Sequence, residues 1–134
     1  MTKTLQCISP IDGSVYAERA VMDPDMASAL LARARQAQKT WAARPLDERV
    51  AMVNAGVARL NEMKDEVVPE LAHMMGRPVR YGGEFGGMNE RSSYMAGVAA
   101  RGLAPIVLED SENFDRRIER VPHGLVGVIA PWNY

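Results

Sequence analysis

Six apolar residues near the carboxyl end of the sequence, 125–130 (LVGVIA), constrain the fold more than any other feature. A continuous apolar run with β-branched residues is typical of a strand buried on both faces of a parallel sheet. Such a strand needs a partner that is reached through a crossover connection, and no crossover follows in these 134 residues. We therefore expect an α/β architecture whose sheet is incomplete, in an N-terminal fragment of a longer protein.

The residues before this run predict helices. Asp23 is a suitable cap and Pro24 suits a first turn, so we expect a helix from there to Arg44-Pro45. A second helix begins at Leu46 or Asp47, with an apolar stripe at helical spacing: Leu46, Val50, Val53, Val57 and Leu60. Because Pro69 disfavours a helix interior, we expect a break near Lys64 to Asp65, with Pro69 in about the first turn of the next helix. That helix ends at Gly76.

The remaining segments predict one more helix and short strands. Residues 6–21 combine β-type runs with turn residues, which predicts a hairpin that lies against something larger. Residues 82–87 are rich in glycine but follow no predicted strand and lack a Gly-Lys-Ser/Thr ending, so we interpret them as a lead into a helix over 88–102 and not as a phosphate loop. Residues 116–121 alternate charged and apolar side chains, as in a half-exposed strand.

Composition excludes several classes of protein. The formal charge of −1 disfavours a nucleic-acid binder, which would usually carry a basic excess. A single cysteine, Cys7, excludes an internal disulfide framework and fits a reducing compartment. With two histidines and one cysteine we expect no metal site. No apolar run approaches the roughly 18 residues of a membrane helix, and the start lacks a signal-peptide core. We expect a cytoplasmic protein with no nucleic-acid or membrane partner.

Residues 120–134 (RVPHGLVGVIAPWNY) resemble a stretch of the NAD(P)-dependent aldehyde dehydrogenase superfamily. In that family "E-P-x-G-V-V-x-x-I-x-P-W-N" carries the first strand of the dinucleotide-binding sheet into a Pro-Trp-Asn motif. The upstream order agrees, because the hairpin, the helix ending near Trp41, Arg49 in a long helix and the Gly76-Arg77-Pro78 turn all have similar counterparts. The resemblance implies the helical part and first strand of a Rossmann-like cofactor-binding domain.

The resemblance also implies roles for residues 129–133. The family's asparagine at the position of Asn133 donates its amide N–H₂ to the developing oxyanion, a contribution of about 3–4 kcal/mol to barrier lowering. Ile129, Ala130, Pro131 and Trp132 would lie at the nicotinamide cofactor, either NAD or NADP. Ligands of open α/β sheets bind beyond the carboxyl ends of the strands, which agrees with this placement. Without the family, Asn133 would close a turn and Trp132 would be a packing residue.

The family's chemistry also needs residues that these 134 do not contain. A cysteine thiolate attacks the aldehyde to form a thiohemiacetal, hydride passes to NAD(P)+, and a glutamate-activated water hydrolyses the resulting thioester. In the family these groups lie far beyond Pro-Trp-Asn, and Cys7 is in the wrong segment to replace the cysteine. We therefore expect the segment alone to be inactive.

The resemblance divides the chain into three regions. Residues 1–112 would be the hairpin and helical part, 113–124 a strand of an oligomerisation arm, and 125–134 the first strand of the sheet. The arm implies a homodimer or homotetramer.

An alternative from another class of protein is a self-contained helical interaction module whose last strand pairs with a partner protein. His73, His123, Glu84, Glu109 and Asp110 form no convincing acid–base pair, and we interpret them as surface, packing or cap residues.

Overall fold

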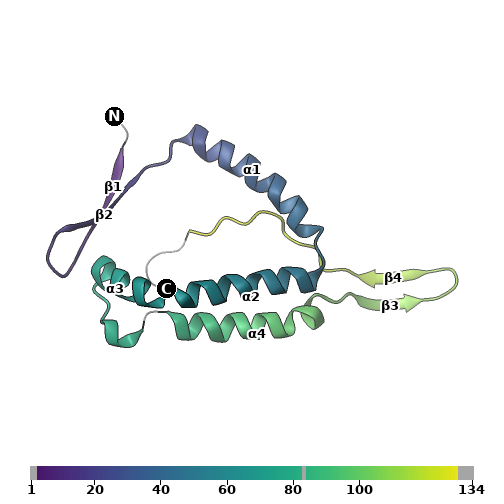
Figure 1. Cartoon of the computed structure of the whole chain (residues 1–134). Coiled ribbons are helices and arrows are strands. Elements are labelled where there is room, and N and C mark those ends of the chain that lie inside the picture. Colours follow the sequence, from purple (N-terminus) through teal and green to yellow (C-terminus); the bar gives the residue numbers. More distant parts are fainter. Residues whose placement is uncertain (1–2, 83, 130–134) are drawn as a thin grey trace.

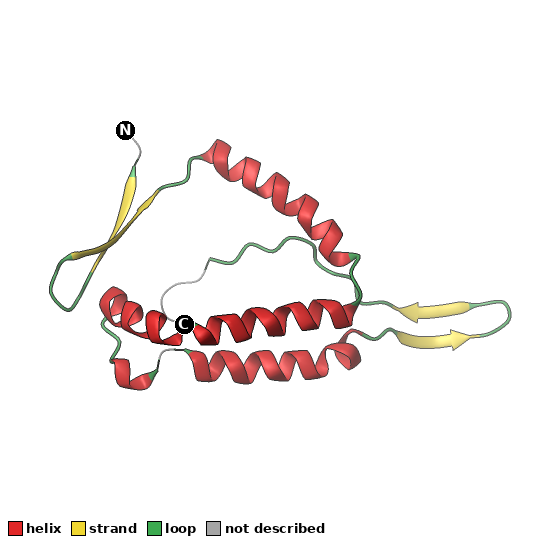
Figure 2. Ribbon diagram, viewed as in Figure 1, coloured by secondary structure: helices red, strands yellow, loops and turns green. Residues whose placement is uncertain are grey.

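The computed structural model describes residues 3–82 and 84–129, and these form helices flanked by two β-hairpins (Figures 1 and 2). The helices are α1 (Pro24–Ala42), α2 (Leu46–Glu62), α3 (Lys64–Met75) and α4 (Phe85–Leu103), with a short 3₁₀ turn, η1 (Val79–Tyr81). The strands are β1 (Thr4–Ile8), β2 (Val15–Ala20), β3 (Ile106–Asp110) and β4 (Asp115–Ile118). Each hairpin is a two-stranded antiparallel sheet, and no parallel sheet occurs in the described part of the chain.

The N-terminal hairpin is confirmed, and its turn is organised around Ser9 and Asp12. Ser9, which is 1% exposed, accepts from the Gly13 amide at 2.9 Å and donates its own amide to the Ser14 carbonyl at 2.8 Å. An Asp12 carboxylate oxygen accepts from the backbone amide and the hydroxyl of Ser14 at 3.0 and 2.7 Å. Gly13 has φ +75°, a left-handed conformation that glycine adopts at least cost. The hairpin lies against α3, which agrees with the prediction that it packs on a larger element.

Helix α1 begins where the sequence predicts. An Asp23 carboxylate oxygen accepts from the Met26 amide at 2.8 Å, and Pro24 is the first helical residue. No residue of α1 is buried. The apolar face of this helix, with Leu30 and Leu31 close to half exposed, is thus left largely uncovered by the described chain.

The break between α2 and α3 falls at Met63, next to its predicted place, but the position of Pro69 differs from the prediction. Because α3 already begins at Lys64, Pro69 is its sixth residue and lies in the second turn. Pro69 has no backbone N–H to donate, and α3 forms without that hydrogen bond. The backbone amides of Glu66 and Val67 donate to the Met63 carbonyl oxygen and begin α3. Gly76 ends α3 in the left-handed region, at φ +73°, as the sequence predicts.

Helix α4 packs along α2 and begins three residues earlier than predicted. Gly86 and Gly87 are therefore part of its first turn and not of a preceding loop. Two half-buried side chains, Asn61 of α2 and Asn89 of α4, exchange amide hydrogen bonds of 2.8 and 2.9 Å. Phe85, at the start of α4, is 7% exposed and is one of the few buried apolar residues in the described chain.

The C-terminal part differs most from the prediction. The expected strand over 116–121 exists only as β4 (115–118), and its partner β3 was not predicted. The boundary expected at 112/113 therefore falls inside the turn of one hairpin. Residues 125–129 carry no strand, because a strand is defined by its hydrogen-bonded neighbour and none lies beside them in the described chain.

The exposed surface is far larger than that of a compact domain. The chain exposes 11251 Å², whereas a compact monomer of 14.7 kDa exposes about 6900 Å². The excess of about 4300 Å² includes large apolar side chains on every helix and both hairpins. The described elements therefore have room for further structure to pack against them.

Candidate functional site

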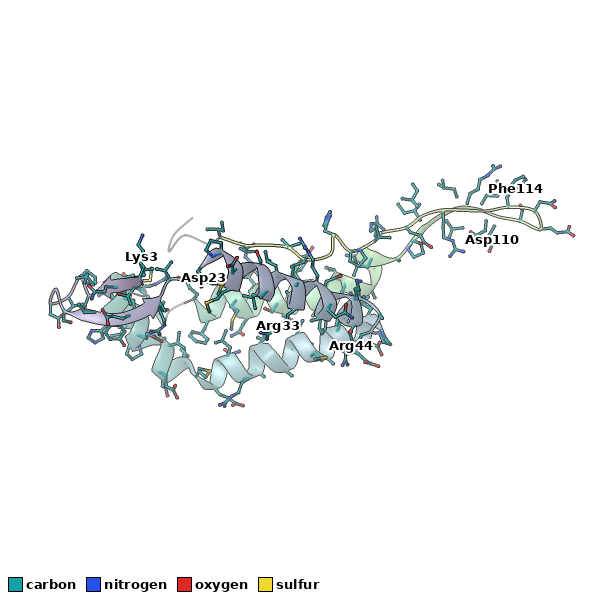
Figure 3. The ribbon with its side chains drawn as sticks, turned by 90° about the horizontal axis from the view of Figure 1, so that it is seen from above. Lys3, Asp23, Arg33, Arg44, Asp110 and Phe114 are labelled. Atoms are coloured by element: carbon teal, nitrogen blue, oxygen red, sulfur yellow. The ribbon has the colours of Figure 1, made fainter. Side chains whose placement is uncertain are left out.

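The predicted site residues lie at the end of the chain. Asn133, Ala130, Pro131 and Trp132 lie outside the described residues, so their predicted roles stay predictions. Ile129 is described, and its side chain is 99% exposed. After β4 the chain continues in the direction of that strand and runs past the helices (Figures 1 and 3).

A groove lies between α2 and α4, and Trp41 from the last turn of α1 also lines it. We call it the α2–α4 groove, and its volume is about 390 Å³. Its lining is mainly apolar and includes Trp41, Leu46, Val50, Val53, Met95 and Ala99. Two arginines, Arg49 from α2 and Arg91 from α4, also line it, and no acidic side chain does so.

Arg49 is the most unusual residue of this groove. Its Nε atom is buried and has no hydrogen-bond partner among the described residues. Five arginines, by contrast, form ion pairs in the described chain: Arg44, Arg59, Arg77, Arg116 and Arg117. A buried N–H of a cationic group without an acceptor costs about 1–3 kcal/mol or more.

A second cavity, of about 610 Å³, lies between the N-terminal hairpin and α3. Cys7 lines it together with Leu71, Met74 and Met75. The Cys7 thiol donates to the Met74 carbonyl oxygen at 3.6 Å. That carbonyl oxygen is not a base for a thiol, which agrees with our prediction that Cys7 is not a nucleophile.

Three of the other titratable residues that we weighed, His73, Glu84 and Glu109, serve packing or exposed ion pairs. The His73 ring stacks on Tyr16 with 5.0 Å between ring centroids and 1° between planes. Glu84 pairs with Arg77, and Glu109 pairs with Arg116 at 2.8 Å.

Two pKa shifts accompany exposed hydrogen bonds near the hairpin turns. Hydrogen bonds from the Ser14 amide and hydroxyl lower the pKa of the Asp12 carboxyl. The hydrogen bond and charge of Asp115 raise the pKa of Arg117. Both shifts belong to exposed groups, so neither marks a catalytic acid or base.

The described residues contain neither a cluster of metal ligands nor a membrane-spanning helix. No group of three or more His, Cys, Asp or Glu side chains within 3–82 and 84–129 could hold a metal ion. Among those same residues, no helix has the length and apolar character to cross a membrane.

The sequence analysis did not predict that Arg49 and Asn61 are polar residues of the α2–α4 interface, although their spacing along α2 indicates it. Arg49 follows Leu46 by three residues and Asn61 follows Val57 by four, so both fall on the apolar stripe of α2. A polar residue at such a position needs a partner from the element that packs there. Asn61 has found one in Asn89.

Comparisons with known proteins agree with the expected family. The chain is 32% identical over 134 residues to vanillin dehydrogenase of Corynebacterium glutamicum and 33% identical over 140 residues to the NAD(+) benzaldehyde dehydrogenase of Pseudomonas putida. Each match covers 95% of this chain but 26% of the relative. The chain thus spans about a quarter of the length of these curated relatives.

Solved structures show the same fold. An NAD-dependent benzaldehyde dehydrogenase from Corynebacterium glutamicum superposes with a TM-score of 0.76 over 87% of this chain and 26% of that chain, at 24% identity. The chain described above therefore has the fold of about a quarter of that enzyme. The model of the aldehyde dehydrogenase family matches residues 1–134, and the chain belongs to this family.

Proposed function

We propose that the protein carrying this segment is an NAD(P)-dependent aldehyde dehydrogenase that oxidises an aldehyde to a carboxylate. The observation that carries the proposal is the family match over all 134 residues. The names of its relatives refine the substrate class, because vanillin and benzaldehyde are both aromatic aldehydes. We propose an aromatic aldehyde as substrate and NAD as the preferred cofactor.

Within this proposal Asn133 supplies the donor for the developing oxyanion. A neutral amide suits this role because it donates N–H without a charge that would attract water or shift neighbouring pKa values. Ile129 to Trp132 would contact the cofactor, whose nicotinamide accepts the hydride.

We also propose that the β3–β4 hairpin joins subunits of a dimer or tetramer. Figure 3 shows it extending away from the helices, with Phe114 near its tip. Val107, Leu108 and Phe114 are each more than half exposed, and the outer edges of β3 and β4 have no neighbouring strand in the described chain. Exposed strand edges beside apolar side chains favour pairing with another chain.

The test is an assay of the full-length protein with NAD+ or NADP+ and a panel of aldehydes. We expect reduced cofactor to form fastest with benzaldehyde or vanillin, and more slowly with acetaldehyde. Asn133→Ala should lower turnover about a hundredfold or more, because one oxyanion donor is lost. Cys7→Ser is the matched control and should leave turnover unchanged.

Two results would contradict the proposal. One is the absence of aldehyde-dependent reduction of either cofactor by the full-length protein. The other is full turnover by Asn133→Ala, which would remove the assigned role of that residue. The segment 1–134 alone should show no activity in the same assay.

A further inference from the structure

The β3–β4 hairpin is braced by its own side chains and turn. A Glu109 carboxylate oxygen accepts from Arg116 across the two strands at 2.8 Å, and the Arg116 guanidinium lies 4.4 Å from the centroid of the Phe114 ring. The backbone amides of Ser111 and Phe114 each donate to the other residue's carbonyl oxygen, at 2.9 and 3.3 Å, and close the turn. The hairpin therefore holds its shape without support from the helices.

The direction in which this hairpin points depends on its base, at the end of α4. The two strands pair mainly with each other and extend away from the helices (Figures 1 and 3). The outermost pair of the ladder at the base is Ile106 with Ile118, and two residues further along the same register Ala104 lies opposite Arg120. There the Arg120 Nη1 atom donates to the Ala104 carbonyl oxygen at 2.5 Å. This hydrogen bond links the segment that enters the hairpin to the segment that leaves it.

The chemistry at the end of α4 suits a cationic donor at this place. Ala104 is the C-cap of α4, and its extended backbone, with ψ 142°, leads into the hairpin. The last carbonyl oxygens of a helix have no partner within the helix and carry a negative partial charge, which a guanidinium stabilises. Pro105 follows and has no backbone N–H, so it cannot donate to the opposite strand. The Arg120 side chain thus supplies a link that the backbone of Pro105 cannot.

We propose that Arg120 is a positioning residue for the subunit interface. Its hydrogen bond to Ala104 fixes the direction in which the hairpin leaves α4, and so presents the hairpin to a second copy of this chain. This inference rests on the proposed function, in which the hairpin joins subunits. A hairpin that is already oriented loses less freedom when it docks, which makes the assembly tighter. In a two-fold dimer each subunit contributes one hairpin, so the effect of the bond counts twice.

Substitution of Arg120 in the full-length protein tests the bond. Arg120→Met keeps an aliphatic side chain but removes the donor and the charge. Amide hydrogen exchange in the outer residues of β3 and β4 should accelerate about fivefold, because one exposed, charge-assisted hydrogen bond is lost. The exchange of subunits between two differently labelled preparations should accelerate by about five- to 25-fold, the effect of one hairpin or of two.

Two further variants show whether these effects belong to this bond. Arg120→Lys keeps a charged donor and should bring both rates most of the way back to those of the unchanged protein. Arg101→Met removes an exposed cation from the last turn of the same helix and should change neither rate. Rates in Arg120→Met equal to those in Arg101→Met, or no recovery in Arg120→Lys, would overturn the inference.

A change at the tip separates this inference from the proposed role of the hairpin. Phe114→Asp should accelerate subunit exchange and leave amide exchange at the base unchanged. If Phe114→Asp accelerates subunit exchange and Arg120→Met does not, the inference is overturned and the hairpin keeps its proposed role. If neither variant changes subunit exchange, the hairpin joins no subunits and both are overturned. Neither readout depends on aldehyde oxidation, so the proposed enzymatic activity is tested separately.

Discussion

The paired amides of Asn61 and Asn89 give the sharpest quantitative test of how α2 and α4 are held together. Asn61 Nδ2 donates to Asn89 Oδ1 at 2.8 Å, and Asn89 Nδ2 donates to Asn61 Oδ1 at 2.9 Å. Asn61 Nδ2 also donates to the Val57 carbonyl at 2.9 Å. Both side chains are half-buried, so water competes only in part for these bonds.

The expected cost follows from the number of bonds that each change removes. A net contribution of about 1 kcal/mol for each hydrogen bond predicts that Asn89→Ala destabilises the α2–α4 pairing by about 2 kcal/mol. Asn61→Ala removes the same two interhelical bonds and also the bond to the Val57 carbonyl, so it should cost about 3 kcal/mol. The double variant should cost about 3 kcal/mol as well, because each single change already breaks both shared bonds. The coupling energy between the two sites is then about 2 kcal/mol.

Native-state hydrogen exchange of the full-length protein is the suitable assay, because it reports local opening of α2 and α4 without requiring reversible global unfolding. A loss of 2 kcal/mol corresponds to roughly thirtyfold faster exchange in these helices. Asn54→Ala, on the exposed side of α2, is the control. If the effects of the two single changes add in the double variant, the amides do not act as a pair and the reasoning fails.

Two further predictions concern local hydrogen bonds of exposed carboxylates. Asp23→Ala removes the cap of the Met26 amide and should destabilise the first turn of α1 by about 1 kcal/mol, seen as faster exchange of its first amides in the full-length protein while α2 is unchanged. The pKa of Asp12 lies below its ordinary value of 3.8, so its contribution to the turn is present above that value and is lost as the pH falls through the lower folded pKa. Ser14→Ala keeps the backbone amide but removes the hydroxyl, so it should raise this pKa part of the way toward 3.8 in an NMR titration, and an unchanged pKa would contradict the contribution of the hydroxyl.

Local sequence signals predicted most of the helices and the first hairpin, because the residues that decide them lie within the elements themselves. Asp23 caps α1 in the structure as the sequence implies, and Gly76 ends α3 in the left-handed conformation that favours glycine. The break between α2 and α3 also follows from local chemistry. The sequence analysis placed Pro69 in the first turn of α3, whereas it lies in the second turn. The start of the helix was hard to predict because no side chain caps it.

Features that depend on distant residues were not predictable in the same way. Strand β3 pairs with β4 across a turn, and the pattern of Ile106 to Asp110 alone does not distinguish a strand from a helix end. The strand expected over 125–130 has no neighbouring strand within the described residues, and strand structure requires a hydrogen-bonded neighbour. The roles of Asn133 and of residues 130–132 came from the family motif, since no local physical pattern defines an oxyanion donor.

The large exposed surface leads to a prediction for the segment 1–134 expressed alone. Its excess of about 4300 Å² over a compact monomer exposes apolar side chains such as Leu31, Met95 and Val128, the last 81% exposed. We expect this segment to self-associate with rising concentration in sedimentation velocity, and to melt without a sharp transition. Association should weaken if Val128, outside every helix and strand, is changed to Asp. A monodisperse monomer with a sharp two-state melt would contradict the reasoning, because it would require the helices to close on one another and bury the surface that they expose here.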